Sequence, residues 1–123
     1  MQVREVIANI NNLAKVIKKE IPMPYPLRRA IRKNYATLSE EYRIFDEERM
    51  KIIAPIQGAD EGNMSVEELS TFKKTKEEIG QKIDEMLNAE VDVQIIKVSE
   101  TALENVDLTV SDEIAIEFMI EEE

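Results

Sequence analysis

The chain has 123 residues, with 26 acids against 16 bases, and contains neither His nor Cys. A chain of this length fits one domain, residues 1–123, whose core needs no disulfide. The missing His and Cys remove the usual general base near neutral pH, the commonest transition-metal ligands and the thiol nucleophiles. Most hydrolase and metalloenzyme classes are thereby excluded, and we expect no catalysis, no cofactor and no metal ion.

The first segment predicts a helix with one buried face, followed by a stiff corner. Its apolar residues are spaced alternately by three and four positions, at Val3, Val6, Ile10, Leu13 and Ile17. Pro22, Pro24 and Pro26 follow, and each removes a backbone donor and restricts the residue before it. The helix must therefore end near Ile21, and Pro26 suits the first turn of the next helix.

Two long helices are predicted next, joined by a loop of about ten residues. The second helix runs from about Leu27 to Ala54, with a regular stripe at Ile31, Tyr35, Leu38, Tyr42, Phe45, Arg49 and Ile52. The third begins after Ser65, which makes a capping box with Glu68. Its own stripe runs from Leu69 to Met86. Two such helices should pack as an antiparallel hairpin.

The chain changes character after Asn88. Val91, Val93 and Ile95 alternate with polar residues, which predicts a strand from Val91 to Val98. Its expected partners are the N-terminal segment 2–4 and the segment near Ile114. Residues 113–120 alternate like a strand but follow a helix-capping signal, so helix and strand both stay open. The expected fold is mainly α (α+β): a helical hairpin, an N-terminal helix, one short strand region and a short terminal helix or strand.

The order of these elements resembles a family of small proteins of unknown function from tailed bacteriophages and prophages of low-GC Gram-positive bacteria. The resemblance lies in the proline corner with its long helix (MPYPLRRAIRKNYATLSEEYRIFDEERMKII), the loop GADEGN, the junction EMLNAEVDVQIIKVSETAL and the ending LTVSDEIAIEFMIEEE. It covers most of the chain and implies a phage or prophage origin and this architecture. No catalytic motif is shared, so it implies no activity.

Charge is strongly segregated along the chain. Residues 98–123 hold nine acids and no base, so 99–123 form an acidic C-terminal segment that ends in Glu121, Glu122 and Glu123. Residues 15–33 hold one acid and seven bases, which we call the basic elbow: Lys15, Lys18, Lys19, Arg28, Arg29, Arg32 and Lys33. The elbow is expected either to face the acidic segment, in the same protomer or the next, or to contact nucleic acid.

Protein–protein interaction is the favoured function, as an adaptor, an assembly factor or a module that binds a host factor. Nucleic acid is the less favoured partner because a net charge of −10 repels a polyanion. Mimicry of nucleic acid by the acidic segment is a further minority interpretation. We also considered a magnesium-dependent nucleotide phosphohydrolase, which holds the metal with an EExxE element. Its third acid is missing after the four Glu-Glu doublets within residues 40–78, where the chain has Ile44, Lys51, Thr71 and Gln81.

The chain also predicts self-association. Tyr35 and Tyr42 lie on the apolar stripe of the second helix and must be covered. Ile44 and Ile53 lie outside that stripe and widen the apolar face beyond what one neighbouring helix hides. We expect a homo-oligomer, a two-fold dimer in which the hairpins pack together and the basic elbow of one protomer meets the acidic segment of the other. No apolar run is long enough to span a membrane and no signal peptide is evident, which predicts a cytoplasmic protein of a bacterial host cell.

Overall fold

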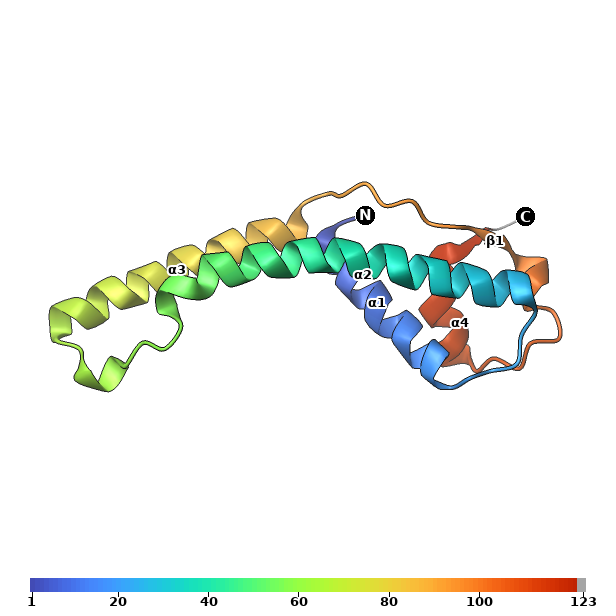
Figure 1. Ribbon diagram of the computed structural model, residues 1–123, viewed down its shortest axis with the longest axis horizontal. Helices are drawn as coiled ribbons and strands as arrows, with labels where there is room; N and C mark the ends of the chain where they lie inside the picture. The colour runs from blue at the N-terminus through green and yellow to red at the C-terminus, as the bar shows by residue number, and fades with distance from the viewer. Residues whose placement is uncertain (122–123) are drawn as a thin grey trace.

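The computed structural model describes residues 1–121 of the chain. It is mainly helical, with a very small sheet, as the sequence predicts (Figure 1). The α-helices are α1 (Val3–Lys18), α2 (Tyr25–Ile53), α3 (Val66–Asn88) and α4 (Val110–Ile116). The strands β1 (Val98–Ser99) and β2 (Ile120–Glu121) pair in parallel. Short 3-10 turns lie at Ala54–Ile56, Glu61–Asn63, Glu100–Leu103 and Glu117–Met119.

The molecule is elongated, and the two halves of α2 have different neighbours (Figure 1). The first half of α2 packs with α1 and with the segment after α3, and α4 lies in the angle between α1 and α2. We call this part the body. The second half of α2 runs antiparallel to α3 and projects from the body, so we call residues 42–88 the arm. The predicted hairpin is confirmed, but α3 accompanies only the second half of α2.

The hydrophobic core lies in the body. One continuous buried cluster joins α1, the first half of α2, α4 and the 3-10 turn after it, and consists of Val6, Leu13, Val16, Leu27, Ala30, Ile31, Leu38, Ala115, Ile116 and Met119. The apolar residues of α2 on the predicted stripe therefore have two kinds of partner. Ile31 and Leu38 belong to the core cluster, whereas Phe45 is buried on the arm.

The helix ends follow from local sequence. After α1 the chain turns at Glu20, whose φ of 54° is left-handed, and the proline corner leads directly into α2. The Ser65 hydroxyl accepts a hydrogen bond from the Glu68 amide at the start of α3. At the start of α4, Thr109 and Asp112 form a reciprocal capping box, which explains how a helix of seven residues begins so sharply.

The predicted strand at Val91–Val98 is wrong in extent. Residues 91–97 have no strand partner, and only Val98 and Ser99 pair, with Ile120 and Glu121. The expected N-terminal partner is present one residue earlier, as an antiparallel bridge between Gln2 and Glu90. The expected partner near Ile114 is not, because that residue lies in α4. Residues 113–120 contain both of the structures that the sequence left open. The segment begins in α4, continues through a 3-10 turn and ends in β2.

A buried side chain takes the place of a strand partner for this segment. Asn34 of α2 donates its Nδ2 to the carbonyl oxygen of Ile96 at 2.9 Å and accepts from the Ile96 amide at 2.7 Å. Asn34 is fully buried. An amide side chain that satisfies both backbone groups of one residue imitates a strand neighbour, so the extended segment is held against α2 without a ladder.

Candidate interaction surfaces

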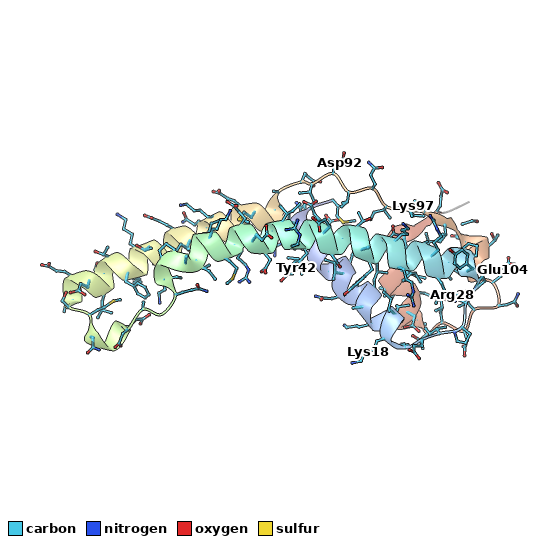
Figure 2. The ribbon with its side chains drawn as sticks, in the orientation of Figure 1. Lys18, Arg28, Tyr42, Asp92, Lys97 and Glu104 are labelled. Atoms are coloured by element: carbon cyan, nitrogen blue, oxygen red, sulfur yellow. The ribbon has the colours of Figure 1, made fainter. Side chains whose placement is uncertain are left out.

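The basic elbow is divided between the two helices that flank the proline corner. Lys15, Lys18 and Lys19 lie at the end of α1, and the four other bases lie in the first turns of α2. All seven side chains belong to exposed residues. Figure 2 shows Lys18 and Arg28, one from each helix. The structure therefore separates a lysine group from an arginine group, and the two have different neighbours.

The lysine group faces α4, in the acidic segment of the same protomer. Lys19 Nζ lies 2.6 Å from Asp112 Oδ1, and the Asp112 side chain is almost fully buried. The other carboxylate oxygen of Asp112 accepts from the Thr109 amide at 3.0 Å. The hydrogen bond from Lys19, and then those from Thr109, hold the pKa of Asp112 below its ordinary value of 3.8. One contact between elbow and acidic segment is thus made within a single chain.

Asp112→Asn is expected to destabilise the protein at neutral pH and to make its stability less dependent on acid. The folded state lowers the pKa of Asp112, so the stabilisation is complete above pH 3.8 and disappears as the pH falls through the lowered value. Urea unfolding at pH 7 and at pH 3 measures both effects. Glu113→Gln, at the exposed neighbouring position, is the control. A free-energy difference between wild type and Asp112→Asn that stays constant across this range contradicts the assignment.

The arginine group borders two hollows. The first, of about 500 Å³, lies between the end of α1, the corner and α2, and is lined by Val16, Ile17, Glu20, Ile21, Pro22, Met23, Arg28, Ile31 and Arg32. The second, of about 510 Å³, is lined by Tyr25, Arg28, Arg29, Arg32 and Lys33. Arg28 and Arg32 line both. Within residues 1–121 none of the four bases forms an ion pair; the Arg28 guanidinium carbon lies 5.7 Å from the centre of the Tyr25 ring.

The arm is the other candidate surface, because its two helices cover each other incompletely. In residues 42–88 only Phe45 and Ile79 are buried. Large apolar side chains on the same segment are more than a third exposed, namely Tyr42, Ile44, Met50, Val66 and Leu69. Figure 2 shows Tyr42 near the place where α1 leaves α2, at the base of the arm. Of the four apolar residues predicted for this surface, Tyr42 and Ile44 are exposed, whereas Tyr35 and Ile53 are half-buried.

Some charged side chains on the arm form ion pairs with nearby residues. Arg43 bonds Glu40 and Glu47, both at 2.5 Å, and the three side chains are exposed, so these pairs add little stability. Lys76 on α3 reaches Glu61 in the connecting loop at 3.0 Å and lies over the ring of Phe72. The contact between Lys76 and Glu61 joins the connecting loop to α3. The ion pairs of the arm leave its exposed apolar side chains uncovered.

Three other predictions concern the C-terminal glutamates, a metal site and a membrane-spanning helix. Glu121 is exposed at the end of β2, and Glu122 and Glu123 lie outside the described residues. Within residues 1–121 no three acids come close enough together to hold a metal ion, so the magnesium hypothesis gains no support. In the same residues no helix is long and apolar enough to cross a membrane.

The sequence did not predict two long-range contacts of the body. The bond between Asn34 and Ile96 joins residues 62 positions apart, and an Asn within a helix gives no sign of its partner. The pair between Lys19 and Asp112 spans 93 positions. The helix-capping signal before residues 113–120 consists of Thr109 and Asp112. The position of Asp112 opposite a base of the elbow depends on how α4 packs on α1.

Comparison with known proteins adds no relative. No family model, no curated protein and no solved structure matches the chain. The resemblance to small phage proteins therefore stays a prediction.

Proposed function

We propose that the chain is a non-catalytic protein-interaction adaptor that associates through its arm. The observation that carries this proposal is the contrast between body and arm. The body has a continuous buried cluster, whereas the arm buries only Phe45 and Ile79 along residues 42–88. Two antiparallel helices each leave part of an apolar stripe open to water, and a further pair of helices is the usual cover.

A second copy of the chain is the proposed cover. Each arm offers the same two half-covered stripes, so two arms packed around a two-fold axis form a four-helix bundle with matching partners. The arm carries 11 acids and 7 bases, so two arms repel each other mildly. Apolar burial must then drive the association, and salt should strengthen it by screening the repulsion. A dimer held by elbow and acidic segment would show the opposite salt dependence.

A pair of variants tests association through the arm. Tyr42→Gln with Leu69→Gln removes exposed apolar contacts from both helices of the arm without disfavouring helix. Light scattering after size exclusion should give the mass of two chains for the wild type at about 100 µM and should shift toward one chain in the double variant. Val110→Gln, at a still more exposed apolar position on the body, is the control and should leave the mass unchanged. A wild-type mass of one chain at every concentration contradicts the proposal.

The biological setting is proposed from the sequence alone. The pattern resemblance supports a phage or prophage accessory protein, acting in the cytoplasm of a bacterial host as an adaptor, an assembly factor or a module that binds a host factor. Copurification from cells that express the protein, with the double arm variant as the reference, tests this. Partners that wild type and variant retain equally would not use the arm.

Nucleic acid is a second candidate partner, favoured by one observation. Six of the seven elbow bases form no ion pair within residues 1–121, and Lys19 alone is paired. If these bases contact phosphates, affinity for a single-stranded oligonucleotide must fall steeply with salt and must disappear when Arg28, Arg29 and Arg32 become Ala. Binding that survives the triple substitution would remove the elbow from consideration as a nucleic-acid site.

A further inference from the structure

We propose that the hollow at the proline corner is a second docking site, distinct from the arm, which binds an acidic segment of a partner protein by inserting one apolar side chain. The hollow has an apolar floor and a basic rim. Val16 and Ile31 in the floor are buried, and Ile17, Ile21 and Met23 are half-buried. Its volume of about 500 Å³ exceeds that of a single large side chain and leaves room for the adjoining backbone.

The rim supplies two cations that have no carboxylate partner in the described part of the chain. Arg28 and Arg32 are one helical turn apart on α2, both border the hollow, and neither forms an ion pair within residues 1–121. Arg29 and Lys33 line the adjoining hollow, which Arg28 and Arg32 share. The apolar hollow therefore lies beside a second hollow that is lined mainly by basic residues. A planar guanidinium binds a carboxylate through two parallel hydrogen bonds, so each arginine can take one acid of a partner.

The position of Glu20 sets the direction of the bound segment. Glu20, just after α1, lines the same hollow, to which α2 contributes Arg28 and Arg32. A partner's acids are repelled there and attracted to the α2 side, so the apolar residue enters between α1 and α2 with the acids toward Arg28 and Arg32. The variant Glu20→Gln should therefore bind the acidic segment more tightly. Substitution of Arg28 or Arg32, by contrast, should weaken binding.

An acidic peptide suits this site better than a nucleic acid. The buried residues of the lining, Val16 and Ile31, are apolar and give base edges no hydrogen-bonding partner. The molecule as a whole is acidic, with a net charge of −10, and repels a long polyanion more than a short segment with two or three carboxylates. The arginines attract the carboxylates of an approaching peptide over a long range. The apolar pocket then binds one side chain of the peptide and anchors it.

The experiment uses the full chain and an array of peptides of about eight residues. Each carries one central Leu, Met or Phe between Asp and Glu residues, and the reference peptides have Ser at the centre or Lys at the flanks. The proposal predicts retention of the acidic peptides with an apolar centre and of neither reference. Equal retention of the Ser-centred peptides would show a nonspecific anion site and overturn the proposal, as would retention of none.

Variants then place the binding at the corner. Arg28→Glu with Arg32→Glu should weaken the affinity of the best peptide at least about tenfold, and Ile21→Gln should weaken it severalfold. Lys73→Glu with Lys74→Glu, on α3, makes the same change in net charge and should have little effect. Circular dichroism melting of each variant checks that it is folded.

Two further outcomes would overturn the proposal. If the two double variants weaken binding equally, the effect is one of overall charge. If a single-stranded oligonucleotide binds more tightly than any peptide and loses affinity with Arg28→Glu and Arg32→Glu, the site belongs to nucleic acid. The arm variant Tyr42→Gln with Leu69→Gln should keep its peptide affinity, so failure of this site and failure of association through the arm are separate results.

Discussion

Replacing Leu38 by Asp is expected to remove a large fraction of the protein's stability. Leu38 is fully buried in the cluster that joins α1, α2 and α4. A carboxylate at this position has no cation to pair with and loses the packing of the leucine, which costs about 4 kcal/mol or more, a large fraction of the stability of a small domain. Urea unfolding followed by circular dichroism measures the effect.

Ile79→Asp is the informative comparison, because Ile79 is buried on the arm and lies outside the core cluster. Its substitution should cost less than that of Leu38, since the arm has open sides to which a charge can turn. Asp at Glu41 or Lys82, off the apolar stripes, should change the stability little. If all four variants unfold together with wild type, the stripes were assigned wrongly.

The second large effect is expected at Asn34. In Asn34→Leu the amide and carbonyl groups of Ile96 lose their partner, while Leu fills a similar volume. Unsatisfied backbone groups at this partly buried place should cost about 2–3 kcal/mol. Gln94→Leu, at an exposed position of the same segment, is the control. Hydrogen exchange at the Ile96 amide should also accelerate, and an unchanged exchange rate with unchanged stability would contradict this function of Asn34.

The long helices were predictable because their signals are local. Alternate spacing by three and four positions, the prolines after α1 and the cap at Ser65 each involve residues within one or two turns of each other. The predicted range of Leu27–Ala54 for the second helix differs from the observed Tyr25–Ile53 only at the ends. Local pattern did not reveal that α2 packs with the body over its first half and with α3 over its second, because both partners require the same apolar stripe.

The segment after α3 shows where local pattern is insufficient. Val91, Val93 and Ile95 are half-buried while Asp92 and Gln94 are exposed, so the predicted alternation of burial is correct. Alternation reports which side chains face the core, but a strand also needs a neighbouring backbone, and Asn34 occupies that place. The parallel pairing of Val98 with Ile120 was equally hidden, because it depends on how the chain returns after α4.

The placement of the candidate surface residues was predictable only in part. The seven bases of the elbow are exposed as a sequence with segregated charge predicts. Their division was not predictable: Lys19 pairs with Asp112 of α4, whereas Arg28 and Arg32 border an apolar hollow. Both outcomes depend on how α1 and α2 are placed around the proline corner, and the spacing of charges along the chain carries no information about that angle.

Amide hydrogen exchange at two protein concentrations, about 2 µM and 200 µM, tests association through the arm most directly. If two arms cover each other, amides in residues 42–53 and 66–86 should exchange more slowly at the higher concentration, while those of α1 and α4 should not change. The same exchange rates at both concentrations, or a slowing confined to the body, would contradict the proposal that the arm is the surface through which this protein associates.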